Sequence, residues 1–129
     1  MTLPDVEALL YPDGTYADPV KITELALFLQ NANSGKVASS LLVKTSPGLV
    51  FGFTVSSVSA QFIQVFDAEA LPADTAVPTL SFAVAATSQL AVAWIPPRGF
   101  RNGIVLCNSS TQHTKTIGSA DCVFDVQYL

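Results

Sequence analysis

From residue 37 onward, short apolar runs rich in Val, Ile and Phe alternate with clusters of Gly, Pro, Ser and Asp, roughly every eight to twelve positions. Short β-branched and aromatic runs bounded by turn residues are typical of strands, and this spacing is typical of sandwiches. The pattern therefore predicts an all-β fold, a jelly-roll-like β-sandwich of about seven or eight mostly antiparallel strands. The expected strands are residues 37–45, 49–55, 61–66, 79–85, 89–95, 103–107 and 122–126.

Three of these runs carry more specific expectations. In 61–66, Phe62 and Phe66 share one face while Ile63 and Val65 share the other, so both faces are apolar and the strand is expected to be central. Runs 79–85 and 89–95 flank Ala86-Thr87-Ser88 and are expected to form a hairpin. Runs 103–107 and 122–126 are expected to pair and close the sheet, displaying the polar loop between them at one end.

The length of 129 residues suits one domain, which we expect at 37–129, preceded by an N-terminal arm or peripheral segment at 1–36. Residues 20–30 fit either a short helix or a peripheral strand, and 31–35 would cap or turn it. The arm is too apolar for a free tail, so we expect it to dock on a neighbouring subunit. Its candidate contact residues are Leu3, Val6, Leu9, Leu10, Tyr11 and Tyr16.

Only 12% of the residues are charged although 50% are hydrophobic, which favours apolar surfaces intended for partners. The net charge of −4 argues against nucleic acid as a partner, because a sequence-independent grip on phosphates needs clustered Lys and Arg. No apolar run reaches the roughly 18–20 residues of a membrane helix, so no membrane partner is expected. The first ten residues also lack the basic residues of a signal peptide.

Catalysis is not expected. His113 is the only histidine, and although Ser109, Ser110 and Asp121 are near it in sequence, it lies in a polar loop without a nucleophile-elbow pattern. No glycine-rich phosphate loop occurs, so no cofactor is predicted. We interpret His113 as a solvated loop residue.

A metal site is not expected either. Asp67, Glu69 and Asp74 could gather oxygens around Ca²⁺, but their spacing matches no EF-hand loop and Pro72 interrupts it. A solvated acidic loop is the favoured interpretation. Asn108-Ser109-Ser110 has the form of a glycosylation sequon and is interpreted as turn chemistry, given the absence of a secretory signal.

The cysteines and one aromatic cluster leave alternatives open. Cys107 and Cys122 are expected to be small buried hydrophobes, and the alternative is that their sulfurs are close enough to pair if the two strands are neighbours. Trp94 and Phe100 gather beside Pro96-Pro97, where they either plug one end of the sandwich or anchor a protein contact.

An ordered set of short motifs also resembles tailed-bacteriophage virion proteins over residues 46–128. The motifs are the turn Ser46-Pro47-Gly48, the strand ending Phe66-Asp67-Ala68, the loop Leu71-Pro72-Ala73-Asp74, the strand Asn102-Gly103-Ile104-Val105 with its preceding Phe100, Ser109-Ser110-Thr111, and the closing 121–128. In one departure, Thr75 stands where that family usually has glycine, so this loop is expected to turn differently.

The resemblance implies a non-enzymatic structural protein of the phage particle, foremost a capsid decoration or cement protein. Such a protein would be made in the bacterial host cytoplasm and lie on the outer surface of the virion. Its expected partners are the major capsid protein and itself, as a homotrimer. The alternative is a head-fibre, tail or adhesin module that binds host glycans through the loops 67–79 and 109–119.

Overall fold

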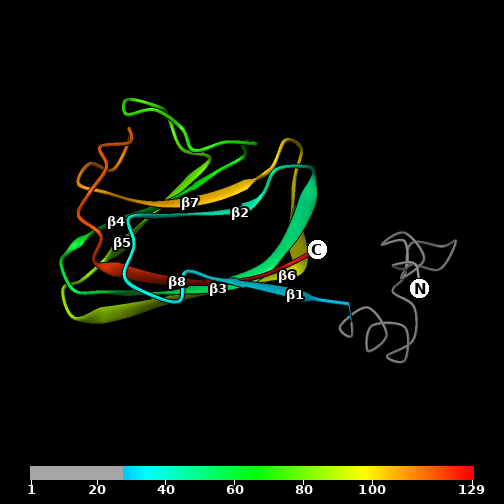
Figure 1. Cartoon of the computed structure of the whole chain (residues 1–129), viewed down its shortest axis with the longest axis horizontal. Coiled ribbons are helices and arrows are strands. Elements are labelled where there is room, and N and C mark those ends of the chain that lie inside the picture. Colours follow the sequence, from blue (N-terminus) through cyan, green and yellow to red (C-terminus); the bar gives the residue numbers. More distant parts are fainter. Residues whose placement is uncertain (1–27) are drawn as a thin grey trace, which may run out of the picture. The chain divides into compact units, whose positions relative to one another are not determined.

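Eight strands account for most of residues 28–129, which is the part of the chain that the computed structural model describes (Figure 1). Their bounds are β1 Gln30–Asn33, β2 Ser40–Lys44, β3 Gly48–Ser57, β4 Gln61–Phe66, β5 Leu80–Val84, β6 Ser88–Phe100, β7 Ile104–Ser109 and β8 Cys122–Tyr128. All seven strands expected after residue 37 are present, and β1 is additional.

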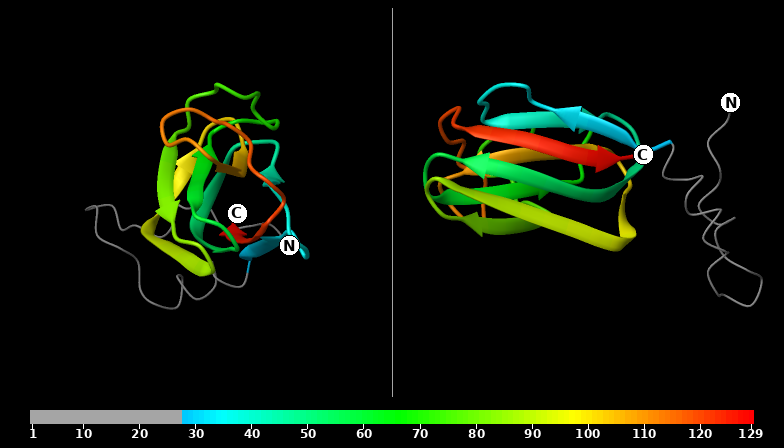
Figure 2. Two further views of the ribbon diagram at one scale, coloured as in Figure 1. Left: turned by 90° about the vertical axis from the view of Figure 1, so that its left-hand side faces the viewer. Right: turned by 90° about the horizontal axis from the view of Figure 1, so that it is seen from below.

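The strands form two four-stranded antiparallel sheets, with orders β1-β8-β3-β6 and β2-β7-β4-β5 (Figure 2). The first strand therefore lies beside the eighth, the second beside the seventh, the third beside the sixth and the fourth beside the fifth. This nesting is the order of a jelly roll, in which a long hairpin is rolled up so that its two arms alternate between sheets. The predicted all-β, jelly-roll-like sandwich is confirmed.

The core lies between the sheets and follows the two-residue period of the strands. Phe53 and Phe124 are its largest fully buried residues, and the Phe53 ring meets Phe82 and Trp94 edge-on at centroid distances of 5.8 and 5.7 Å. Around it lie fully buried side chains from four strands, including Val50, Val55, Ile63, Val65, Ile104, Leu106, Phe124 and Val126.

Strands β4 and β7 are buried on both faces. On the face away from the core, Phe66, Val105 and Cys107 form a second apolar cluster, packed against Ala68 and Ala76 from the connection between β4 and β5. The sheet β2-β7-β4-β5 is thus covered twice, by the other sheet and by loops. The expectation of a central strand at 61–66 is confirmed, because β4 lies between β7 and β5.

Two expected strand pairings are wrong. The runs around Ala86-Thr87-Ser88 do not form a hairpin, because β5 pairs with β4 in one sheet and β6 pairs with β3 in the other. The runs at 103–107 and 122–126 are likewise split, since β7 pairs with β2 and β4 whereas β8 pairs with β3. Jelly-roll connections cross from sheet to sheet, and local alternation of residues does not reveal the crossing.

The first sheet begins earlier than residue 37. Residues 31–33, expected to cap or turn, belong to edge strand β1, and Ser34 N–H donates to the Phe124 carbonyl at 3.0 Å. The turn then falls at Gly35, whose φ of 69° favours glycine. The arm contact candidates from Leu3 to Tyr16 lie outside the described residues. No helical segment suited to spanning a bilayer occurs in the described part.

Strand β6 extends beyond its expected end at residue 95. It continues through Pro96 and Pro97 to Phe100, and residues 94–97 bulge opposite Phe51 of β3. Proline is tolerated here because β6 is an edge strand, so a missing N–H breaks no ladder on its open side.

Candidate binding surface

Two long connections, 67–79 between β4 and β5 and 110–121 between β7 and β8, meet above the outer face of the sheet β2-β7-β4-β5 (Figure 1). We call them together the loop layer. They are joined like two short strands, because Thr75 N–H donates to the Lys115 carbonyl and Lys115 N–H donates to the Ala76 carbonyl, both at 2.8 Å. The structure therefore brings together the two loops singled out in the sequence, folded over a sheet face rather than displayed only at one end.

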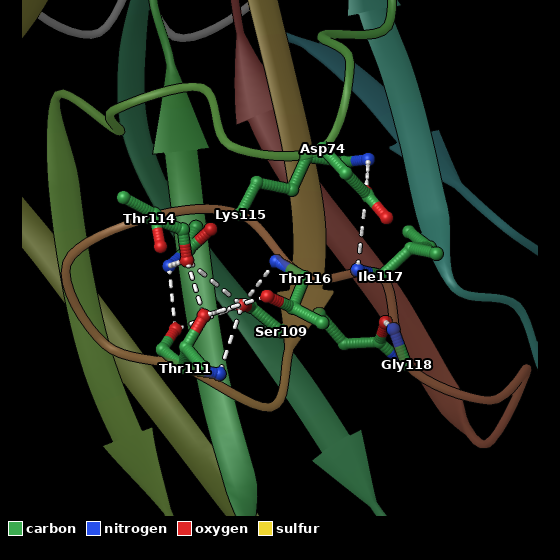
Figure 3. Close-up of polar contacts among 10 residues, drawn as sticks. Asp74, Ser109, Thr111, Thr114, Lys115, Thr116, Ile117 and Gly118 are labelled. Atoms are coloured by element: carbon green, nitrogen blue, oxygen red, sulfur yellow. Dashed lines mark hydrogen bonds and ion pairs between the residues drawn. The ribbon is translucent and has the colours of Figure 1, made fainter.

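An ion pair fastens the loop layer from within. The Lys115 ammonium lies 2.9 Å from Asp74 Oδ1, with the lysine side chain 4% exposed and the aspartate 52% exposed (Figure 3). The same oxygen accepts the Ile117 N–H at 3.2 Å. These two donors, the Lys115 ammonium first, lower the pKa of Asp74 below its ordinary value. The only buried ammonium among the described residues is thus neutralised where it lies.

Ser109 organises the turn of the second loop. Its hydroxyl oxygen accepts N–H groups from Thr111 and Thr116 at 3.1 and 2.9 Å, and it lies 2.8 Å from the Thr111 carbonyl to which it donates (Figure 3). The Thr111 hydroxyl in turn donates to the Thr114 carbonyl at 2.7 Å. Side-chain hydroxyls satisfy backbone groups that a loop cannot pair by itself.

Two buried amides hold the same loop from the sheet beneath. Gln64 of β4 is fully buried, and its Nε2 lies 2.9 Å from the Thr111 carbonyl, with further loop carbonyls at 3.1 Å. Asn108 of β7 donates from Nδ2 to the Ser119 carbonyl at 2.6 Å and accepts the Gly118 N–H at 3.0 Å. The loop is therefore tied to the sheet on both sides of Lys115.

Asp67 fixes the start of the first loop. Its carboxylate accepts N–H groups from Arg101, Asn102 and Gly103 at 3.1, 2.8 and 3.4 Å. Desolvation raises its pKa, but these backbone hydrogen bonds outweigh it and leave the pKa below the ordinary value.

The two aspartates of this loop therefore accept hydrogen bonds from protein donors, and the acidic residues do not gather around a common point. Asp67 binds three backbone N–H groups, Asp74 binds Lys115, and Glu69 is exposed. Within residues 28–129, no three His, Cys, Asp or Glu side chains are arranged to hold a metal ion.

Asp121 anchors the other end of the second loop. It accepts hydrogen bonds from the Ser59 hydroxyl and from Gln61 Nε2, the latter at 2.7 Å. These contacts, with Ser59 as the largest cause, lower the pKa of Asp121. The loop layer is thus fixed at both ends by carboxylates, Asp67 and Asp121.

Thr75 occupies the loop position where the resembling family usually has glycine. Its φ is 77°, in the left-handed region that a β-branched residue rarely adopts. Thr75 therefore adopts a backbone conformation that glycine would adopt without strain, and the expectation that the loop turns differently from that of the family stays a prediction. Its N–H bond to Lys115 is one reason that the conformation persists.

Apolar side chains project from this fastened frame. Leu71 is 51% exposed, Val77 is 75% exposed and Ile117 is 39% exposed. The two loops contain no Trp, Tyr or Phe. Exposed aliphatic side chains on a hydrogen-bonded frame, most of whose charged groups are already paired with protein partners, suit contact with another protein better than binding of a charged or planar ligand.

Trp94 and Phe100 both pack against the core. Phe100 is 3% exposed and belongs to the main cluster, whereas Trp94 is half-buried and has the Arg98 guanidinium 6.0 Å from its ring centroid. Both therefore pack in the hydrophobic core, and whether they close one end of the sandwich stays a prediction. A role for either residue in partner binding stays a prediction.

The remaining candidate residues occupy ordinary structural positions. His113 is exposed in the loop. Cys107 and Cys122 are free and buried, and they lie in different sheets, Cys107 of β7 in the outer cluster and Cys122 of β8 in the main core, so the interpretation as buried hydrophobes is confirmed. Burial raises the pKa of the Cys107 thiol to about 11. Asn108, first residue of the sequon, is fully buried and tied into the loop.

The residues that build this surface were not evident in the sequence. Gln64 interrupts an apolar strand, and a polar residue facing an apolar cluster is the one signal that could have marked it. Lys115 lies in the polar run Gln112 to Thr116 and carries no such signal, since a lysine among threonines is normally solvated. Comparisons with protein-family models, with curated proteins and with solved structures find no match for this chain.

Proposed function

We propose that this protein is a non-enzymatic structural subunit of a tailed-phage particle, a decoration protein that binds the outer face of the capsid shell and stabilises it. The loop layer is the surface that contacts the shell. The partner is then the major capsid protein, and the protein lies on the outside of the virion.

The observation that carries the proposal is the fastened loop layer with its exposed aliphatic side chains. The Lys115–Asp74 pair and the two backbone hydrogen bonds order the loops before any partner arrives. A surface that is already ordered loses little conformational entropy on binding, and a decoration protein must bind with little reorganisation to act as a clamp. Leu71, Val77 and Ile117 supply the apolar contacts.

Two further features support this function. The ordered motifs of residues 46–128 resemble virion proteins, and jelly rolls occur widely in viral capsid proteins as well as in lectins. Fold alone does not specify function, so the main support for the proposed function is the loop layer. Shell stabilisation would follow from mass action, because a ligand that binds only the assembled shell adds free energy in proportion to the logarithm of its saturation.

The test uses particles of the source phage that lack this chain, to which purified protein is added back. Native protein is expected to bind the shell and raise the temperature at which particles release DNA. Leu71→Asp and Ile117→Asp are expected to lose both effects while remaining folded. Ile95→Asp, which adds the same charge on the other sheet, is the matched control and is expected to keep contact with the shell.

Cryo-electron microscopy of the native particle gives an independent result. Density for the sandwich on the outer shell, with the loop layer facing the capsid, is expected. Density only at the tail or vertex would contradict decoration and would favour the fibre or adhesin alternative. Unchanged particle stability on removal of the chain would also count against the proposal.

A further inference from the structure

A side of the sandwich away from the loop layer is conspicuously uncharged. Residues 80–97, which cover β5 and β6 up to Pro97, contain no Asp, Glu, Lys or Arg, and Arg98 is the one charged residue of β6. Each of these strands is the edge strand of its own sheet, and both lie at the same side of the sandwich (Figure 2). At the opposite edges, by contrast, Lys44 ends β2 and Lys36 follows β1.

An edge strand without charges is a liability for a protein that stays alone. Proteins normally protect open edges with lysine, proline or a bulge, because unpaired N–H and C=O groups invite pairing with another chain. In β6 the bulge and the prolines protect only residues 94–97, and residues 88–93 have no such protection. Among the described residues, no strand pairs with this outer edge.

The bulge of β6 and the start of the strand carry complementary shapes. Ile95, in the bulge, is 96% exposed, the highest value among the large hydrophobic residues described. At the start of the strand lies a groove of about 370 Å³, lined by Thr87, Ser88 and Gln89, by Ser56, Ser57 and Val58, and by Val37, Asp121 and Val123. Val37 and Val58, which are 52% and 63% exposed, supply apolar parts of its rim, and Asp121 is its one charged residue.

Antiparallel pairing of two copies along β6 brings these shapes together. If residues 89–93 pair about Ala91, then Ile95, within the bulge that follows, lies at the level of Thr87 of the second copy, the turn residue that precedes β6 and lines the groove. The side-chain alternation of β6 is consistent with this pairing. Leu90 and Val92 face the core, whereas Gln89 and Ala93 are exposed on the face that carries the groove. A twofold axis then inserts each Ile95 at the groove of the other copy.

We propose that two copies of this chain associate through antiparallel pairing of β6, with Ile95 of each copy seated in the groove between β3 and β6 of the other. The contact is isologous, as in most homodimers, and requires no charge complementarity. It occupies the open edge and removes the most exposed apolar side chain from water. It is separate from the proposed shell contact, because the loop layer lies on the other sheet.

The test is the molar mass of the full-length chain in solution over a range of concentrations, measured by sedimentation equilibrium. Twice the mass of one chain is expected for the native protein. Ile95→Asp is expected to weaken self-association about 100- to 10,000-fold, because it removes one buried aliphatic side chain from each of the two grooves. Leu71→Asp, an exposed residue of the loop layer, is the matched control and should not change the mass.

Introducing opposite charges at Ala91 in two separate variants tests whether the twofold axis passes near this residue. Ala91→Lys and Ala91→Glu each place like charges opposite one another across the twofold, so each variant alone is expected to be monomeric. An equimolar mixture of the two is expected to recover the double mass, which also shows that both variants are folded. Ala83→Lys on β5 is the matched control outside the paired strand.

Three outcomes would overturn the inference. They are a native chain that stays monomeric at every concentration, a trimeric mass, and a dimer that is insensitive to both Ile95→Asp and the Ala91 variants. Shell binding is scored separately with Leu71→Asp, so loss of one proposal leaves the other standing. A dimer with no affinity for shells would reject decoration alone, and a shell-binding monomer would reject the twofold contact alone.

Discussion

Lys115 and Asp74 form an ion pair of unequal burial, in which the ammonium is almost wholly enclosed and its carboxylate partner faces solvent. The lysine is the member that cannot remain alone, because an unpaired charge in a low-dielectric site is costly whereas a carboxylate in water is not. This asymmetry ranks the effects of substitution in the loop layer.

Asp74→Asn is accordingly expected to destabilise the protein more than Lys115→Met. The first change leaves an unneutralised buried ammonium, whereas the second replaces the lysine stem by an apolar chain of similar length and leaves no buried charge. Urea unfolding monitored by far-UV circular dichroism measures both free energies of unfolding. A Lys115→Met protein less stable than Asp74→Asn would contradict the role given to the pair.

The loop at Thr75 is expected to become more stable on substitution by glycine. Thr75 has a φ of 77°, and a left-handed conformation costs a residue with a Cβ roughly 1–2 kcal/mol, which exceeds the entropic cost of glycine in the unfolded chain. Thr75→Gly should therefore raise the free energy of unfolding by about 0.5–1 kcal/mol. Thr114→Gly, in the other loop and without a positive φ, is the control and should not stabilise.

Gly103 is expected to tolerate no side chain. A Cβ there would lie 2.3 Å from the Ala68 carbonyl oxygen and 2.6 Å from the Lys44 carbonyl oxygen, both backbone atoms that cannot move aside. Gly103→Ala should cost about 2–3 kcal/mol of stability through overpacking. Gly99→Ala is the matched control, because its nearest neighbour is Leu49 Cδ2 at 3.8 Å, and a comparable loss in both would argue against this geometry.

Acid should destabilise the fold through Asp67, Asp74 and Asp121, whose pKa values are all lowered in the folded state. In the unfolded chain these carboxyls titrate near pH 4, so as the pH falls the unfolded state takes up protons first. Their contribution is thus complete above about pH 5 and is lost as the pH falls through the folded pKa values. Chemical unfolding at several pH values measures the slope.

Removing one of these carboxylates should flatten that acid slope. Asp121→Asn deletes one proton difference between the folded and unfolded states, so its stability should depend less on pH below about 5. Glu69→Gln, in an exposed part of the loop layer, is the control. An unchanged slope in Asp121→Asn would mean that the Ser59 and Gln61 contacts do not hold the ionised form in solution.

Both cysteine thiols should be unreactive in the native protein. Cys107 and Cys122 are fully buried, and a pKa of about 11 leaves the Cys107 thiol protonated at neutral pH. Neither should react with a thiol-specific reagent until the chain is unfolded in guanidinium, when both should react. Rapid labelling of either native thiol would contradict the packing of its cluster.

The strands could be predicted from the sequence because burial of one or both sheet faces leaves a direct mark on side-chain alternation. In 61–66 the predicted and observed bounds coincide. Which strands pair could not be predicted, because Ala86-Thr87-Ser88 has the residues of a hairpin turn and in fact bridges the two sheets. Strand partners in a jelly roll are distant in sequence, so no local pattern records them.

The candidate surface was predictable only in outline. The turn residues of 67–79 and 109–119 predict that both segments are loops. The contacts that hold the loops to each other and to the sheet come from Lys115, Gln64 and Asn108, which look like ordinary polar positions in the sequence. Lys115 is buried only because the first loop supplies Asp74, a contact across 41 positions of sequence. Polar residues acquire such roles from tertiary structure, whereas apolar periodicity is a property of the strand itself.

Strand β8 has a consequence for how the protein is made. It lies between β1 and β3 in its sheet, although it is the last strand of the eight, and it supplies Phe124 and Val126 to the core. A nascent chain therefore exposes the unpaired edges of β1 and β3 and an incomplete core until residue 128 has been made. The sandwich cannot close before β8 is available, so its folding depends on contacts between strands distant in sequence and is expected to be slow for a domain of this size, with apolar surface exposed in the meantime.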